Sequence, residues 1–458
     1  MAEGLDVGCW MLDVHSARPS HRHSTNPHPM KLPRLLPLLT LAALAFSTRA
    51  FAEIQYVIAI SVDGLRGDFL QGFVDAAPAA FPNIVRLRDA SAFTYNARCD
   101  YDYSETVPNH LAMVTGRPVL QPVRHSSRAF TGFTNNFPTA TDTVHVYAAA
   151  SGTNPGPYKA GIFDVAHDRG LSTALYLGKT RLELIRRSFN AANGAPDVTG
   201  ADNGRNKIDF AQVQDGNTGT LISTLVAHIA GTLERFTFLH ITDPDTAGHS
   251  GGWTTTVGGA YRNSIVAVDG YVGSILNALA ANPALADKVA VMLTGDHGGG
   301  GLAGQLTAHT DATQPGNYTI PFFLSAPGVP RGSDLYALFE NRVNPGAGRP
   351  AFVDSSQPVH NADIANLSAA LLGLPAVPDS IPQPVFITPM MITQSGEAIT
   401  VSWPLYLSGY TLECAGELTA TDWTSVTTGL VETGGQTTYS IPFPPPAQQY
   451  FRLRATAE

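Results

Sequence analysis

The sequence predicts an α/β protein, with a doubly wound, mostly parallel sheet followed by a small C-terminal all-β sandwich domain. Apolar runs rich in β-branched residues indicate strands that are buried on both faces of a parallel sheet, and helical patterns alternate with them. The expected strands are 54–62, 173–177, 236–241, 289–294 and 320–325. The expected helices are 84–90, 110–115, 161–169, 221–229, 261–279 and 363–372. After residue 374 the pattern changes to short, roughly alternating segments, which are typical of a small sandwich.

The composition is that of a globular protein. Of the 458 residues, 44% are hydrophobic and 14% are charged, which excludes collagen, coiled coils and wholesale disorder. The chain has 28 Lys and Arg against 37 Asp and Glu, a net charge of -9, so no nucleic-acid-binding surface is evident.

The N-terminal region has the pattern of a targeting signal. Residues 30–52 combine a short basic start, an apolar run over 35–46 and Ala50-Phe51-Ala52, which together predict a secretory signal peptide. The apolar run is too short to span a bilayer, so no transmembrane segment is expected once the signal is removed. Residues 1–29 are interpreted as an over-extended start. We therefore expect export to the periplasm or the extracellular space.

The C-terminal region is expected to form a separate domain. Residues 375–384 contain four prolines and are interpreted as a linker, and residues 385–458 as the sandwich domain. The expected strands are 398–403, 410–414, 423–427, 438–443 and 450–454.

Polar clusters follow several of the predicted strands or begin a helix. They contain Asp63, the segment 104–110 with Thr106, the segment 243–249 with Asp245 and His249, the segment 294–298 with Asp296 and His297, and finally His309. An Asp-Gly pair after a strand is usually only a turn. Three aspartates and three histidines at the same edge of one sheet, however, indicate metal binding, because mixed Asp/His ligation is typical of hydrolytic zinc sites. Six such ligands suit two metal ions about 3.5–4 Å apart.

These motifs resemble the alkaline phosphatase superfamily, and most closely its type I phosphodiesterase/nucleotide pyrophosphatase branch. The resemblance spans 54–374, with the motifs in the family's order, and implies an alkaline phosphatase-like catalytic domain over 53–374. The Thr-x-Pro-Asn-His motif matches 106–110 and implies that Thr106 is the nucleophile. The Pro-Asp-x-x-Gly-His motif matches 244–249, and Asp-His-Gly matches 296–298.

The resemblance also implies the ligands and the reaction. One zinc ion would be bound by Asp63, Thr106, Asp296 and His297, and a second by Asp245, His249 and His309. The implied activity is hydrolysis of small phosphodiesters or pyrophosphates through a phospho-threonine intermediate. Metal coordination would supply the activation that a threonine hydroxyl needs.

Several alternatives remain open at this point. Asp243 competes with Asp245 as a ligand, His360 competes with His309, and His110 is interpreted as a structural residue at the start of a helix. Asn109 and Asn135 are candidates for contact with the phosphate. Lys179 follows a strand and could face the active site, but a solvated side chain is the favoured interpretation.

Other activities remain possible within the superfamily. A phosphomonoesterase or a phosphonate hydrolase is an alternative, whereas a sulfatase would need Cys or Ser in place of Thr106 and Arg in place of His110. A secreted binding protein with an inactive domain is the non-enzymatic alternative. All six ligand positions and the nucleophile position carry competent residues, which favours an enzyme.

Overall fold

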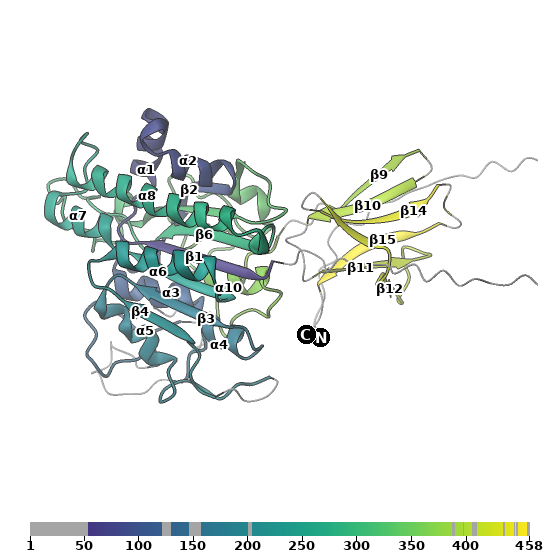
Figure 1. Cartoon of the computed structure of the whole chain (residues 1–458), viewed down its shortest axis with the longest axis horizontal. Coiled ribbons are helices and arrows are strands. Elements are labelled where there is room, and N and C mark those ends of the chain that lie inside the picture. The colour runs from purple at the N-terminus through teal and green to yellow at the C-terminus, as the bar shows by residue number, and fades with distance from the viewer. Residues whose placement is uncertain are drawn as a thin grey trace, which may run out of the picture.

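The computed structural model describes residues 54–120, 130–145, 157–199, 204–386, 390–396, 398–404, 410–433, 436–443, 445 and 448–455. The predicted signal peptide and the preceding residues lie outside this range. A large α/β domain and a small β domain are visible in Figure 1. The predicted fold class is confirmed.

An eight-stranded sheet forms the centre of the large domain, in the order β4-β3-β5-β1-β6-β7-β2-β8. Its strands are β1 (Tyr56–Val62), β2 (Ala92–Arg98), β3 (Thr173–Leu177), β4 (Phe210–Val213), β5 (Phe236–Ile241), β6 (Val289–Gly295), β7 (Thr319–Ser325) and β8 (Ser333–Asp334). Neighbouring strands are parallel except that β7 pairs antiparallel with both β6 and β2. The sheet is therefore mostly parallel, with β1 between β5 and β6 near its middle.

Helices cover both faces of this sheet. The described helices are α1 (Gly67–Ala76), α2 (Pro82–Asp89), α3 (Thr106–Thr115), α4 (Ile162–His167), α5 (Glu183–Ser188), α6 (Thr218–Ala230), α7 (Asp243–Gly251), α8 (Ala260–Ala281), α9 (Pro315–Tyr318) and α10 (Asp363–Leu371). Apolar side chains of α1, α2, α6 and α8 pack on one face, and those of α3, α4, α5 and α10 pack on the other. Strand β1 contributes to both cores: Val57 and Ala59 point to one face, and Ile58 and Ile60 to the other. This alternation explains why the strand reads as one continuous apolar run.

Among the described residues, α8 is the one helix that is long and apolar enough to cross a membrane. It packs against α2, α6 and α7. The Asp269 carboxylate on this helix accepts hydrogen bonds from the backbone of Asn83 and Ile84 at the start of α2. Within the described fold, α8 is thus a core helix of the α/β layer.

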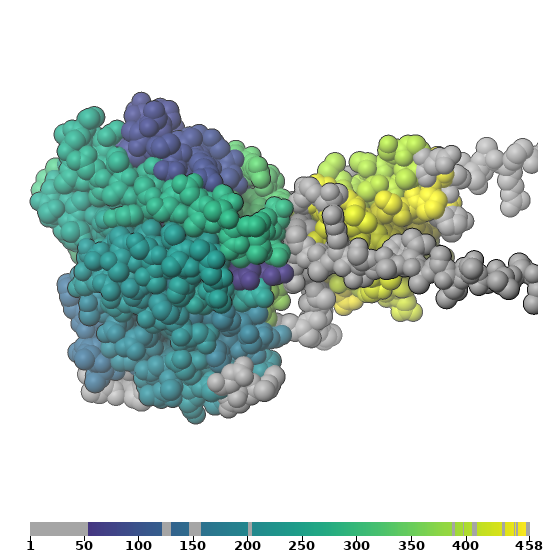
Figure 2. All heavy atoms as spheres, in the orientation of Figure 1, coloured from purple at the N-terminus to yellow at the C-terminus, as the bar shows by residue number. Residues whose placement is uncertain are grey.

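The small domain consists of two antiparallel sheets, ordered β13-β14-β10-β9 and β12-β11-β15. The strands are β9 (Met391–Ser395), β10 (Ala398–Pro404), β11 (Tyr410–Ala415), β12 (Thr424–Ser425), β13 (Leu430–Thr433), β14 (Gln436–Pro442) and β15 (Tyr450–Ala455). Figure 2 shows it as a separate mass beside the α/β domain.

The proline-rich segment before this domain packs on the α/β domain. Val377 is buried, the Ile381 N–H donates to the Gly116 carbonyl, and Phe386 packs on Phe339 with ring centroids 5.0 Å apart. The segment is therefore anchored along its length. The domain boundaries at 374 and 384 remain predictions.

Candidate metal centre

The sheet brings the polar clusters to one edge. Val62, the last residue of β1, is in register with Ile241 at the end of β5 and with Gly295 at the end of β6. The next residues of β1 and β6 are Asp63 and Asp296, so their carboxylates emerge side by side at the carboxyl ends of parallel strands. This is the usual position of ligand sites in such sheets.

A glycine allows the loop after β1 to approach α7 closely. Gly64 has a φ of +71°, in the left-handed region that glycine adopts without strain. A Cβ atom at this position would lie 2.9 Å from the Cα atom of Asp245. The Asp63-Gly64 turn thus places Asp63 against the first turn of the helix that carries Asp245.

The first group of candidate ligands contains Asp63, Asp296 and His297, all buried. The Nε2 atom of His297 lies 3.5 Å from Asp63 Oδ1 and 3.4 Å from Asp296 Oδ2. Thr106 Oγ1 lies 3.5 Å from the same Asp63 oxygen. The structure therefore brings together all four residues that were predicted for one metal ion.

The second group contains Asp245, His249 and His309. His249 Nε2 lies 3.4 Å from Asp245 Oδ1 and 3.2 Å from His309 Nε2. The ring of His309 stacks on the ring of His297 at a centroid distance of 3.9 Å, so the two groups are adjacent. Asp245 and His309 are buried, whereas half of the His249 side chain is exposed. The centre is therefore open to solvent on the His249 side.

The three candidate histidine ligands all direct Nδ1 toward a backbone carbonyl oxygen. Nδ1 of His249 lies 3.0 Å from the Thr307 carbonyl oxygen. Nδ1 of His297 lies 2.7 Å from the Gly298 carbonyl oxygen, and Nδ1 of His309 lies 2.5 Å from the Ser104 carbonyl oxygen. A carbonyl only accepts hydrogen bonds, so each Nδ1 carries the proton and each Nε2 keeps a lone pair for a metal.

Unpaired buried atoms provide a test of whether this donor set fits a metal. Asp245 Oδ1, Asp296 Oδ2 and His297 Nε2 are buried and have no hydrogen-bond partner. Buried polar atoms are normally paired, and burying them without a partner is costly. All three are lone-pair donors within the two groups, so the residues fit divalent metal ions.

The electrostatics of the first group also favour a cation. Burial opposes ionisation of Asp63, but the Lys179 ammonium and the His240 hydrogen bond outweigh it and hold the pKa of Asp63 well below its usual range. Burial, followed by the Asp63 carboxylate, raises the pKa of Asp296 well above its usual range. Burial lowers the pKa of His297, which keeps its ring in the neutral, metal-binding form.

Thr106 is the first residue of α3, and its side chain is buried next to the first group. The helix ends at Thr115 and is followed by Gly116, which adopts a left-handed φ of +64°. A helix N-terminus carries partial positive charge and backbone N–H groups suited to a phosphate. The sequence predicted a helix only from His110, so the structure adds one turn that includes the candidate nucleophile.

The structure does not support Asn109 as a phosphate contact. Its Oδ1 accepts hydrogen bonds from the Asp100 N–H and from Asn361 Nδ2, each at 2.9 Å. Its Nδ2 donates to the carbonyl oxygens of Tyr103 and Glu105. Every hydrogen-bonding position of this amide is used inside the fold, which gives Asn109 a structural role.

Asn136, and not the predicted Asn135, reaches the start of α3. The Asn135 amide bonds the backbone of Phe137 within its own turn. Asn136 Oδ1 accepts a hydrogen bond of 2.9 Å from the Val107 N–H, so the Asn136 amide lies beside the first turn that holds Thr106. The adjacent asparagines were visible in the sequence, but the pattern did not show which of them faces the helix.

The two alternative ligands, Asp243 and His360, lie outside both groups. Asp243 accepts hydrogen bonds from the hydroxyl groups of Thr218 and Tyr271 and belongs to neither group. His360 stacks on Phe352 and lies 3.1 Å from Gln357 Oε1.

His110 lies between α3 and the end of β1. Its Nδ1 is 2.7 Å from the Thr106 carbonyl oxygen and its Nε2 is 2.9 Å from Ser61 Oγ. These contacts hold α3 against the end of β1.

The prediction that Lys179 is solvated is wrong. Its side chain is 10% exposed, and Nζ lies 2.7 Å from Asp63 Oδ2 and 2.5 Å from Asp245 Oδ2. Lys179 follows β3, which pairs with β5, and this position brings it to the same edge of the sheet. The sequence shows a lysine after a strand but carries no signal for its two partners.

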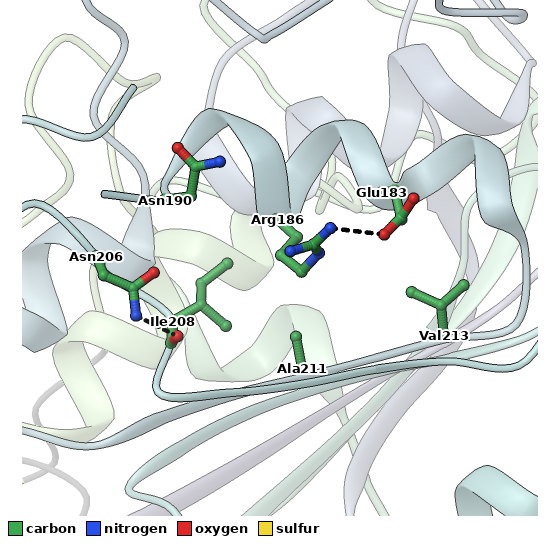
Figure 3. Close-up of a pocket in the computed structure, with 7 residues that line it drawn as sticks. All are labelled: Glu183, Arg186, Asn190, Asn206, Ile208, Ala211 and Val213. Carbon is green, nitrogen blue, oxygen red and sulfur yellow. Dashed lines mark hydrogen bonds and ion pairs between the residues drawn. The ribbon is translucent and has the colours of Figure 1, made fainter. Parts of the chain in front are cut away.

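Of two surface pockets, one lies next to the candidate metal centre and the other does not. One pocket, of about 300 Å³, is lined by Lys179, Thr180, Arg181, Asp215, Gly216, Thr242 and Thr246. A pocket of about 440 Å³ lies between α5 and β4, where Figure 3 shows the Glu183–Arg186 ion pair on one wall. No candidate ligand lines either pocket, but the smaller one includes Lys179, which contacts Asp63 and Asp245, and it therefore adjoins the candidate metal centre.

An α/β sheet with two adjacent Asp/His groups beside a helix N-terminus is the arrangement expected of a metal-dependent hydrolase. The chain belongs to the type I phosphodiesterase/nucleotide pyrophosphatase family, which it matches over residues 57–312, more than half of its length. This match confirms the resemblance seen in the motifs. Among curated proteins, none matches the chain.

Several solved structures are similar to the chain at low sequence identity. An inactive form of murine ectonucleotide pyrophosphatase/phosphodiesterase 5 in complex with AMP is 12% identical, with a TM-score of 0.45, and the match covers 71% of this chain and 96% of the murine one. An alkaline phosphatase superfamily protein from Vibrio parahaemolyticus is 11% identical, with a TM-score of 0.45 and coverages of 76% and 75%. The lipoteichoic acid synthase LtaP from Listeria monocytogenes is 12% identical, with a TM-score of 0.48 and coverages of 77% and 83%.

Proposed function

We propose that this protein is an exported, two-zinc phosphodiesterase that cleaves small phosphodiesters or pyrophosphates through a phospho-threonine intermediate at Thr106. The observation that carries the proposal is the meeting of Thr106 with two adjacent Asp/His groups whose buried lone pairs lack partners. Three aspartates and three histidines are a donor set typical of hydrolytic zinc sites.

The residues divide into two sets of ligands. Asp63, Thr106, Asp296 and His297 would hold one ion. Asp245, His249 and His309 would hold the other. Divalent ions held by these residues would supply Lewis-acid stabilisation of the negative charge that develops in the transition state.

The reaction consists of two displacements at phosphorus. In the first, Thr106 Oγ1 bonds to phosphorus, the bond to the leaving oxygen breaks, the threonine proton passes to solvent, and the leaving group takes a proton from water. In the second, water bonds to phosphorus, the bond to Thr106 breaks, and a proton returns to the hydroxyl. The product is a phosphate or a phosphomonoester.

Two features of the chain would orient the phosphoryl group. The N-terminus of α3 directs positive potential toward Thr106. The Asn136 amide lies beside this turn and can donate from Nδ2 to a phosphoryl oxygen while Oδ1 holds the Val107 N–H. Both are fixed before substrate binds, so little reorganisation is needed in the transition state.

A substrate panel tests the proposed activity. With zinc-loaded protein, bis-p-nitrophenyl phosphate is expected to give a higher kcat/KM than p-nitrophenyl phosphate, p-nitrophenyl sulfate or a phosphonate monoester. Preference for the monoester or the phosphonate would favour one of the alternative activities within the superfamily. No turnover of any substrate by protein with both metals bound would favour the binding protein.

Export is supported by the sequence of residues 30–52 alone. We expect the mature chain to begin at Glu53. N-terminal sequencing of protein secreted by an expressing cell checks this, and an intact Met1 or Met30 would contradict it.

A further inference from the structure

A buried lysine joins the two groups of candidate ligands. The Lys179 ammonium lies 2.7 Å from Asp63 Oδ2, in the first group, and 2.5 Å from Asp245 Oδ2, in the second. These two contacts place a positively charged side chain between the two groups of candidate ligands. The proposed reaction does not use this lysine.

Lys179 divides the oxygens of each carboxylate into an outer and an inner one. The outer atoms, Asp63 Oδ2 and Asp245 Oδ2, both contact the ammonium. The inner Asp63 Oδ1 lies 3.5 Å from His297 Nε2. The inner Asp245 Oδ1 lies 3.4 Å from His249 Nε2 and has no hydrogen-bond partner. Lys179 thus holds one oxygen of each aspartate. The other oxygen faces the candidate ligands, where, among the described residues, Asp63 Oδ1 has only the long hydrogen-bond contact of 3.5 Å with Thr106 Oγ1 and Asp245 Oδ1 has no hydrogen-bond partner.

A second contact supports this division at Asp63. His240 Nε2 lies 3.0 Å from Asp63 Oδ2, and the Gly178 N–H donates to His240 Nδ1 at 3.1 Å. Because Nδ1 accepts, the ring proton is on Nε2 and is donated to the carboxylate. Gly178 immediately precedes Lys179, so one turn after β3 fixes both groups that hold the outer oxygen of Asp63.

We propose that Lys179 is a positioning residue of the metal centre, which holds the outer oxygens of Asp63 and Asp245 so that each aspartate presents a single oxygen to its own metal ion. This inference rests on the proposed two-metal function. Hydrogen-bonding partners of this kind orient metal ligands, and their loss typically weakens metal binding about 10–100-fold. A compact ammonium with three donors can serve two carboxylates from different elements at once.

The test compares Lys179→Met with the wild type in metal binding, using zinc for affinity and cobalt(II) for its absorption spectrum. We expect both proteins to bind metal, with K179M about 10–100-fold weaker. The visible absorption of the cobalt form should also change in intensity, because aspartates freed from Lys179 can bind through both oxygens and raise the coordination number. Equal or tighter zinc binding with an unchanged cobalt spectrum would overturn the inference.

Lys207→Met is a matched control. Lys207 is also a buried lysine between two aspartates, with Nζ 3.2 Å from Asp168 and in contact with Asp197. Its carbonyl accepts a hydrogen bond from Thr173, the first residue of β3, whereas Lys179 follows the end of that strand. K207M should lower thermal stability without changing metal affinity or the cobalt spectrum.

A chemical rescue covers the case in which K179M fails to fold. Lys179→Cys, treated with 2-bromoethylamine, carries an ammonium on a side chain of nearly the same length as lysine. Treatment should raise its zinc affinity at least about tenfold toward the wild-type value. Wild-type protein treated in the same way controls for modification of Cys414. Absence of recovery would overturn the inference.

The two proposals fail differently. A wild-type protein that binds no metal would overturn the proposed function and, with it, the role of Lys179. A wild type that binds two ions, with K179M indistinguishable from it, would overturn only the role of Lys179.

Discussion

Replacing Thr106 with alanine is expected to lower kcat for a phosphodiester by about 1,000-fold or more, because the first displacement loses its nucleophile. Metal binding should persist. Asp63, Asp296 and His297 remain as ligands of the first site. Steady-state kinetics, together with metal analysis of the same preparation, separates the loss of chemistry from the loss of the ion.

Thr106→Ser is the control for this substitution. Serine keeps a hydroxyl at the same position, so T106S should retain much more activity than T106A while binding the same two ions. A T106A protein whose kcat stays within about tenfold of the wild type would show that the nucleophile is another group.

Removing the metal ions is expected to abolish activity, and zinc should restore it. His309→Ala should lower metal content by about one equivalent per chain, because the second group then keeps only Asp245 and His249 as protein ligands. We expect kcat/KM to fall by at least about 100-fold, as when a preorganised group that stabilises transition-state charge is lost. Metal analysis after dialysis, with kinetics on the same sample, measures both effects.

His360→Ala is the matched control for H309A. His360 is buried like His309, but it stacks on Phe352 and belongs to neither ligand group. H360A should therefore keep both ions. The opposite result, with H360A losing an ion and H309A keeping both, would transfer the last ligand position to His360.

The sequence predicts the central sheet well because those strands are buried on both faces. Strand β3 has the predicted bounds, and so does β5. Both are continuous apolar runs, and the polar residues that follow such strands meet at one edge. This geometry is why the six candidate ligands could be gathered from the sequence.

Other elements carry too weak a pattern to be predicted. Strand β2 reads Ala-Phe-Thr-Tyr-Asn-Ala-Arg, with polar and aromatic residues mixed, and its pairing with β7 shifts register after Thr94. Strand β4 has four residues and lies at the edge of the sheet. Helix α7 carries no helical pattern in the sequence, because Asp, Pro and Gly make up five of its nine residues.

The missed parts of the site depend on tertiary contacts. Lys179 is a partner of Asp63 and Asp245 only because β3 lies beside β5 in the sheet. Asn136 meets Val107 through a contact between segments 29 residues apart. Neither relation has a local spacing that a sequence motif could reveal.

The stereochemistry of the reaction at phosphorus tests the role of Thr106 most directly. Wild-type zinc-loaded protein would hydrolyse a phosphorothioate diester that is chiral at phosphorus, in isotopically labelled water, and the configuration of the product would be determined by phosphorus NMR. Two in-line displacements, first by Thr106 and then by water, predict overall retention of configuration. Inversion would mean a single direct attack by water and would contradict a phospho-threonine intermediate.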